Sequence, residues 1–193
     1  MSNAIIVEEI CRSLVVKFNR PEMRSPLSIE VLESLLHIVT RADDMTKIDS
    51  LVFTGRDGVF ASGADLREIA HVPAGNAARE FAMRGQRLMT GISQLRCETI
   101  AAVNGICFGG GLDLALACDR RIASPGALFS HPGANLGIMT GWGGTQRLTR
   151  LTGEAKALEM FFTARRVDAE EALSIGLISA IADDPLELAL TLT

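Results

Sequence analysis

Apolar positions recur along the chain with two periods, and these periods predict strands and helices. Short β-type apolar runs predict strands at residues 5–7, 14–18, 51–54, 99–103, 121–123, 127–130 and 177–181. Helical spacing predicts helices at residues 28–41, 66–70, 77–95, 112–118, 141–151, 154–162 and 168–175. Because strands and helices alternate, we expect α/β packing in one domain that spans residues 1–193.

Local signals refine several of these elements. Ser28 is a plausible N-cap for the first helix, and the first two strands predict a hairpin that closes at Asn19-Arg20-Pro21. We expect residues 55–65, which carry three glycines, to form a loop, and Pro73 and Gly75 to break the chain before the long helix. Apolar residues at 186–190 are expected to begin a further helix.

Composition and charge exclude several classes of protein. The net charge of −4 is spread over mixed signs, so no polybasic surface for nucleic acid is expected. The first ten residues lack the features of a signal peptide, and the weakly polar stretch 99–118 carries Asn104 and Asp113, so we expect no membrane segment. The four cysteines form no CxxC pair and the three histidines are scattered, which predicts neither a metal site nor disulfides. A reducing cytoplasm fits this cysteine usage.

Two glycine-containing loops are the candidate chemistry. Gly109-Gly110-Gly111 lies between a predicted strand and a predicted helix, whose N-terminus presents unpaired backbone N–H groups. The loop at 60–66 has a similar design, and two such loops can direct one N–H each at a shared oxygen, as an oxyanion hole does. A tight packing turn is the alternative, because a glycine run alone is weak evidence. Neither GxxxxGK[ST] nor GxGxxG spacing is present.

Three longer segments carry a family resemblance. FASGADLREIA at 60–70, TIAAVNGICFGGGLDLALACDRRIAS at 99–124 and GANLGIMTGWGGTQRLTRLTGEAKALEM at 133–160 are similar to the enoyl-CoA hydratase/isomerase, or crotonase, superfamily. The stretches NRPEMRSPLS and RRVDAEEALSIGLISAI extend the similarity over essentially the whole chain, in the family's order. The resemblance implies a spiral of ββα turns and an acyl-CoA substrate, with coenzyme A entering as part of the thioester and no separate cofactor.

The resemblance also implies roles for particular residues. It places the thioester oxygen between the N–H groups of Ala64 and Gly110. The residues that fall where the family wraps coenzyme A are Met23, Ser62, Asp65 and Leu66. Gly141 falls where a backbone amide helps to place the reacting group. The family's assembly implies a homotrimer or a dimer of trimers if the terminal helices are present.

The chain departs from the family pattern at the catalytic carboxylates. Hydratases of the family use two glutamates. In this chain the first of these positions is Asp113 and the second is Gly133, which the resemblance also places in the substrate pocket. We predict that Asp113 transfers the proton, although an acid near a helix start also favours the dipole or caps local amides. His131 is a candidate for the missing acid–base group, and the alternative is a packed or surface histidine.

Three further expectations concern the pocket, the strands and the C-terminus. Trp142 either narrows the acyl pocket or anchors the core, while Asp119 and Arg121 are expected to be structural. The chain ends at Thr193, where family members continue into terminal helices, so we expect a crotonase core truncated at its C-terminus and lacking that helical region.

The expected function is that of an acyl-CoA enzyme which stabilises a thioester enolate in a backbone oxyanion hole. Hydration or isomerisation of an enoyl-CoA would follow, and Gly133 favours chemistry that needs fewer carboxylates than hydration does. The alternative is a catalytically weak acyl-CoA-binding or assembly protein that retains the fold.

Overall fold

The strands form two sheets. Along the middle of the chain consecutive strands alternate between them, so that one strand of each pair joins the larger sheet and the next joins the smaller sheet. The computed structural model describes residues 4–192, so the parts of the expected domain at residues 1–3 and Thr193 lie outside it. A six-stranded sheet has the order β1 (Ile5–Ile10), β2 (Ser13–Phe18), β3 (Ser50–Thr54), β5 (Glu98–Val103), β7 (Arg120–Ala123) and β10 (Ala180–Ile181). A four-stranded sheet has the order β4 (Val59–Ala61), β6 (Ile106–Phe108), β8 (Leu128–Ser130) and β9 (Val167–Asp168). Neighbouring strands are parallel except at the β1–β2 and β8–β9 edges.

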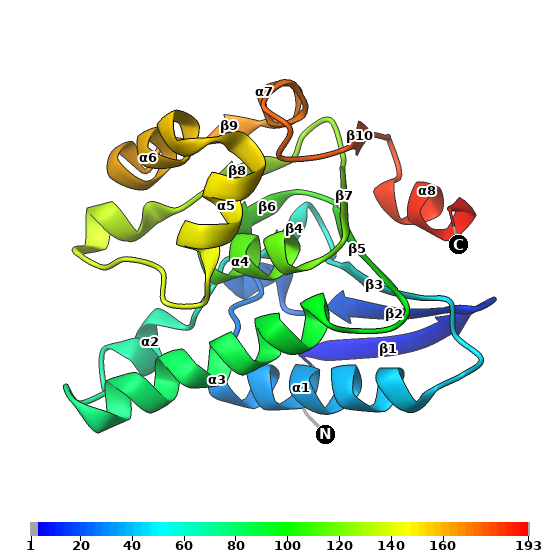
Figure 1. Cartoon of the computed structure of the whole chain (residues 1–193), viewed down its shortest axis with the longest axis horizontal. Coiled ribbons are helices and arrows are strands. Elements are labelled where there is room, and N and C mark those ends of the chain that lie inside the picture. Colours follow the sequence, from blue (N-terminus) through cyan, green and yellow to red (C-terminus); the bar gives the residue numbers. More distant parts are fainter. Residues whose placement is uncertain (1–3, 193) are drawn as a thin grey trace.

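Helices follow each pair of strands and complete the expected ββα spiral. The α-helices are α1 (Ile29–Asp44), α2 (Leu66–Ile69), α3 (Asn76–Ser93), α4 (Gly110–Ala117), α5 (Gly144–Thr152), α6 (Glu154–Thr163), α7 (Ala169–Ser174) and α8 (Pro185–Thr191). Short 3₁₀ helices are η1 (Pro21–Met23) and η2 (Pro132–Leu136). Thus β3 and β4 lead to α2 and α3, β5 and β6 lead to α4, and β7 and β8 lead to η2 and α5 (Figure 1).

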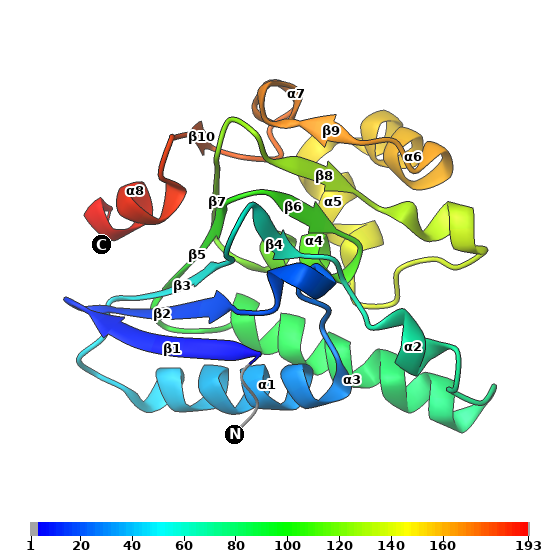
Figure 2. The same ribbon diagram turned by 180° about the vertical axis from the view of Figure 1, so that it is seen from behind.

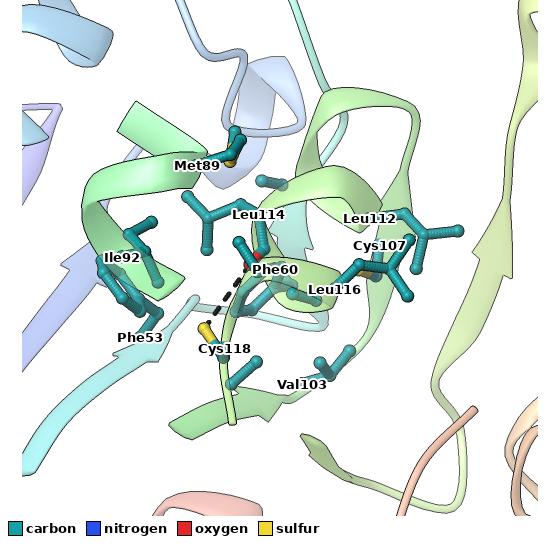
Figure 3. Close-up of a cluster of buried hydrophobic side chains, with 14 of the residues drawn as sticks. Phe53, Phe60, Met89, Ile92, Val103, Cys107, Leu112, Leu114, Leu116 and Cys118 are labelled. Atoms are coloured by element: carbon teal, nitrogen blue, oxygen red, sulfur yellow. Dashed lines mark hydrogen bonds between the residues drawn. The ribbon is translucent and has the colours of Figure 1, made fainter. Parts of the chain in front are cut away.

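The main core surrounds α4, which is buried along its whole length. Figure 3 shows Phe53, Met89 and Ile92 gathered with Leu114 and Leu116 of this helix. An α-helix that is apolar on every side must pack against other elements on every side, and no side of α4 faces solvent. Both views show α1 and α3 lying side by side below the large sheet, with α8 beside β5 and β7 (Figures 1 and 2). A second apolar cluster under α8 includes Val15, Val52, Ile100 and Ala189.

The predicted hairpin forms, but the predicted position of its turn is wrong. The chain turns at Cys11-Arg12, and Ile10 pairs with Ser13 across it. Glu8 and Glu9 belong to β1, because the edge strand β1 is partly exposed and accepts charged side chains. Cys11 takes the left-handed conformation, with φ of 54°. The segment Asn19-Arg20-Pro21, predicted to close the hairpin, instead leads into η1.

The short strands of the second sheet differ most from expectation. The predicted loop at residues 55–65 contains β4, and neither β6 nor β9 was expected. Strands of two or three residues are too short to show a period, so their pairing partners decide their conformation. The strand predicted at residues 177–181 is confined to Ala180–Ile181.

Asp119 and Arg121 have the structural roles expected for them, although they do not pair with each other through their side chains. The Asp119 carboxylate accepts hydrogen bonds from the backbone and hydroxyl of Thr99, both within 2.8 Å. Arg121 is buried and donates to the carbonyl oxygens of Leu177 and Cys118, at 2.8 and 2.7 Å. These bonds brace the ends of β5 and β7.

Neither a transmembrane helix nor a candidate metal cluster occurs in the described residues. Between residues 4 and 192 no helix has the length and apolar character needed to cross a bilayer. The same residues hold no group of three or more His, Cys, Asp and Glu side chains placed to bind a metal ion. All four cysteines are free thiols, of which Cys107 and Cys118 are buried.

Candidate active site

A largely apolar cavity of about 390 Å³ is lined by residues of α2, α3, α4 and the η2–α5 segment. Most of its wall is aliphatic or aromatic, with contributions from Phe81, Ile138 and Phe161. Its acid–base groups are Asp113 and His131. An apolar pocket with few convergent polar groups is the usual form of a small-molecule site.

The two glycine-containing loops meet at this cavity. Gly63 has φ of +93°, and a Cβ placed on it would lie 2.6 Å from the Gly110 nitrogen. The first loop is fixed by the Leu27 N–H, which donates to the Gly63 carbonyl, and the second by the Gly109 N–H, which donates to Ser130. Ala64 and Gly110 both line the cavity.

The backbone nitrogens of Ala64 and Gly110 are available to a ligand. Among the backbone hydrogen bonds of residues 4–192, neither nitrogen is a donor. Gly110 is the first residue of α4, where N–H groups have no partner within the helix and the helix dipole is positive. An oxygen that carries negative charge is the natural acceptor for such a pair of donors.

Asp113 lies in the first turn of α4 and is fully buried. Its Oδ2 accepts a hydrogen bond from the Thr140 hydroxyl, whereas its Oδ1 has no partner among the described residues. Burial raises the pKa of Asp113 to about 7, and the Thr140 hydrogen bond and the charge of Arg147 act in the opposite direction. The capping part of the alternative for Asp113 is wrong, because the carboxylate accepts from the side chain of Thr140 and not from local amides. Its place in the first turn of α4 does favour the helix dipole, as that alternative expected.

The side chain of His131 lies next to that of Asp113, and both residues line the cavity. Its Nε2 lies 3.4 Å from Asp113 Oδ1, which is beyond the normal length of a hydrogen bond between nitrogen and oxygen. The imidazole packs on the Phe161 ring at a centroid distance of 4.8 Å and is buried, so the surface alternative is wrong. Burial lowers the pKa of His131 to about 4. At neutral pH the imidazole is therefore uncharged.

Gly133, at the second glutamate position, has no room for a side chain. A Cβ there would lie 2.4 Å from the Ile138 carbonyl oxygen, and the Ile138 N–H donates to the Gly133 carbonyl at 3.0 Å. The loop is thus closed against itself at this position. A carboxylate could be restored at residue 133 only if the backbone moved.

Trp142 serves both of the roles that its sequence position suggested. Its ring fills the space above two glycines, since a Cβ on Gly85 or Gly110 would lie within 2.4 Å of indole atoms. The indole also lies near Phe81, with a centroid distance of 6.0 Å, and is buried. Because Trp142 lines the cavity as well, it both anchors the core and limits the pocket.

The candidate coenzyme A positions divide into those at the cavity and those beside it. Ser62 and Leu66 line the cavity. The Asp65 carboxylate caps α2 through the Arg67 N–H and pairs with the Arg67 guanidinium at 2.6 Å. Met23 is exposed at the end of η1 and is not a lining residue. The side chains of Asp65 and Met23 therefore do not line the cavity.

The remaining residues of the site are Gly141, which the sequence marked, and three others, which it did not. Gly141 lines the cavity as expected, and its carbonyl accepts from Gln86 at 2.7 Å. Thr140 and Phe161 touch the acid–base groups, and Arg147 acts on Asp113 by its charge, but no motif position had marked them. They act through contacts made only in the folded chain.

The sequence of this chain is similar to one protein family and to known proteins from several organisms. The sequence model of the family described as Enoyl-CoA hydratase/isomerase matches residues 10–188. The short-chain-enoyl-CoA hydratase of Clostridium acetobutylicum is 36% identical over 96% of this chain and 71% of its own length. The crotonyl-CoA hydratase of Syntrophomonas wolfei is 39% identical over 95% of this chain and 70% of its own length.

Solved structures agree in fold. Pseudomonas aeruginosa DspI superposes with a TM-score of 0.93 at 35% identity, covering 99% of this chain and 79% of that protein. An enoyl-CoA hydratase from Bacillus anthracis gives a TM-score of 0.92 at 34% identity, covering 98% of this chain and 74% of that protein.

Proposed function

Because this chain belongs to the enoyl-CoA hydratase/isomerase family, we propose that it binds an enoyl-CoA thioester in the cavity and stabilises the enolate formed there. The observation that carries the proposal is the meeting of the Gly63 and Gly110 loops. It supports a single oxygen-binding position between the free N–H groups of Ala64 and Gly110. Coenzyme A takes part as the thiol half of the substrate, and no resident cofactor is required.

The proposed chemistry uses the two amides on the thioester oxygen. When a nucleophile attacks the β-carbon, or a base removes a proton from the carbon next to the double bond, negative charge moves to that oxygen. The donors of Ala64 and Gly110 then stabilise the charge more strongly than they do the neutral thioester. The apolar wall strengthens this effect because little water competes for the amides.

Asp113 is the proposed proton-transfer group of this enolate chemistry. It lies one helical turn into α4, whose first residue supplies an oxyanion donor, and both residues line the cavity. A carboxyl group whose pKa is about 7 exchanges protons readily at neutral pH, because it can act as acid or base there.

A substitution at Gly63 tests the oxyanion hole. The Gly63→Ala variant is expected to lose about 10²-fold in turnover of crotonyl-CoA, because its methyl group would press on the Gly110 nitrogen and part the two donors. Turnover is followed by the ultraviolet absorbance of the conjugated thioester. Gly58→Ala is the matched control, since Gly58 also has positive φ, at +73°, but its Cβ would meet nothing within 4 Å.

The control separates backbone strain from the effect on the donors. Both variants are expected to lose about 1 kcal/mol of stability from the strain of alanine at positive φ. Gly63→Ala is expected to lose more than Gly58→Ala, because its methyl group also meets backbone atoms. Equal turnover by Gly63→Ala and Gly58→Ala would contradict the oxyanion assignment. Calorimetric binding of CoA thioesters by the wild type, with no turnover of any of a broad panel, would favour the alternative of an acyl-CoA-binding protein.

We further propose that copies of the chain assemble as a homotrimer or a dimer of trimers in the cytoplasm. Exposed apolar side chains on α6 support an interface between copies, since Leu158 and Phe162 lie one turn apart and are 44% and 72% exposed. Light scattering is expected to give three or six times the mass of one chain. A monomer at every concentration would contradict this assembly.

A further inference from the structure

We propose that His131 is a second catalytic residue, which takes the proton from the attacking water while Asp113 protonates the α-carbon of the substrate. This inference rests on the enolate chemistry proposed above. It would give the enzyme a full hydratase mechanism with one carboxylate and one imidazole. The pair replaces two carboxylates, one of which the closed loop at Gly133 excludes.

The geometry of the two side chains carries the inference. Asp113 Oδ1 and His131 Nε2 are both buried polar atoms without a hydrogen-bond partner among the described residues. They come from different elements, α4 and the residue that precedes η2, and lie 3.4 Å apart. Burying two polar atoms without partners costs free energy, which a water molecule or substrate bound beside them would offset.

The surroundings of the pair fix the orientation of each group. The Thr140 hydroxyl holds Oδ2 of Asp113 and so leaves Oδ1 to face His131. The Phe161 ring packs on the imidazole of His131. Since both residues line the same cavity as Ala64 and Gly110, an enoyl thioester held at the amides would have the pair beside it.

The protonation states match these roles. Burial lowers the pKa of His131 to about 4, so the imidazole is uncharged at neutral pH and passes on readily any proton that it takes up. Burial also raises the pKa of Asp113 to about 7, so near neutral pH about half of the carboxyl groups hold a proton for delivery. The positive charge of Arg147 on α5 lowers the pKa of Asp113. Asp113 in turn helps to raise the pKa of the buried Cys107 thiol of β6.

In the proposed hydration, each bond that forms is matched by one that breaks. An O–H bond of water breaks, the proton goes to His131 Nε2, and the oxygen bonds to the β-carbon of the enoyl group. The electrons of the carbon–carbon double bond move toward the thioester, whose oxygen carries the negative charge between Ala64 and Gly110. The carbonyl then reforms as the α-carbon takes the proton of Asp113. Transfer of a proton from His131 to Asp113, across the 3.4 Å between them, restores the starting state.

Two substitutions at residue 131 test the role of the imidazole. His131→Gln keeps a polar group of similar reach, and His131→Phe keeps a ring on Phe161. Both are expected to lose about 10²-fold in hydration of crotonyl-CoA. Exchange of the α-protons of butyryl-CoA with D₂O, which needs only the amides and Asp113, is expected to stay within about threefold of wild type. The surface variant His37→Gln serves as the control for both assays.

The two assays separate this inference from the proposed function. Hydration at the wild-type rate by His131→Gln or His131→Phe would overturn the role of His131, and so would a wild type that exchanges α-protons without hydrating crotonyl-CoA. Parallel loss of hydration and exchange in both variants would also overturn it, because a merely structural role affects both. A wild type that performs neither reaction would overturn the proposed enolate function itself.

Discussion

Replacing Asp113 with asparagine is expected to reduce turnover of an enoyl-CoA by about 10³-fold, because the amide can neither donate nor accept the transferred proton. Asparagine has nearly the same shape, and its side-chain oxygen can still accept from the Thr140 hydroxyl. We therefore expect the cavity and the oxyanion donors to stay in place, so that the Kd for a CoA thioester changes by less than about threefold. Steady-state kinetics and calorimetry together measure the two effects.

A surface carboxylate provides the matched control for this variant. Asp183 is exposed, and Asp183→Asn is expected to leave turnover unchanged. Wild-type turnover by Asp113→Asn would remove Asp113 from the mechanism. A parallel loss of thioester binding would instead assign the residue to the shape of the pocket.

The same variant is expected to be more stable than wild type at alkaline pH. The pKa of Asp113 is raised in the folded state from 3.8 to about 7, so between these values the folded state holds a proton that the unfolded state releases. Stability from this group is therefore full below about pH 4 and is lost as the pH rises through about 7. The loss amounts to about 4 kcal/mol above pH 7, from the difference between the two pKa values.

Urea unfolding at pH 5 and pH 8 measures this effect. Asparagine cannot ionise, so the advantage of Asp113→Asn over wild type is expected to be larger at pH 8, where it approaches about 4 kcal/mol. His131 contributes the opposite slope, because its lowered pKa weakens the fold as the pH falls from 6.5 to about 4. An advantage that is the same at both pH values would contradict the raised pKa of Asp113.

The longer elements could be predicted from the sequence because their local signals agree with their packing. Ser28 caps α1 by accepting the Val31 N–H, as its position before an apolar period indicated. The helix continues past Arg41 to Asp44 because buried Ala42 extends its apolar face. In contrast, β4 and β6 have three residues each and exist only through pairing with each other and with β8. No local pattern can report such a partner.

The candidate site, like the fold, could be predicted only in part from local sequence signals. The family motifs identified the loops at Ala64 and Gly110, because backbone donors at glycine-containing turns leave a mark in the sequence. The approach of His131 to Asp113 left none, since it depends on how the segment after β8 returns across α4. Thr140 likewise becomes part of the site only through one hydrogen bond in the folded chain. The position of His131 next to a proline in the sequence gave no indication that its imidazole is buried.

Gly144 illustrates how closely helix packing and the carboxyl group share space. A Cβ on this first residue of α5 would lie 1.9 Å from Asp113 Oδ1. Exchanging a helical glycine for alanine is a common route to heat tolerance, worth about 1 kcal/mol. Here that exchange would push the acid out of its place. Directed evolution toward a more heat-tolerant enzyme would have to gain stability at other positions and keep glycine at residue 144.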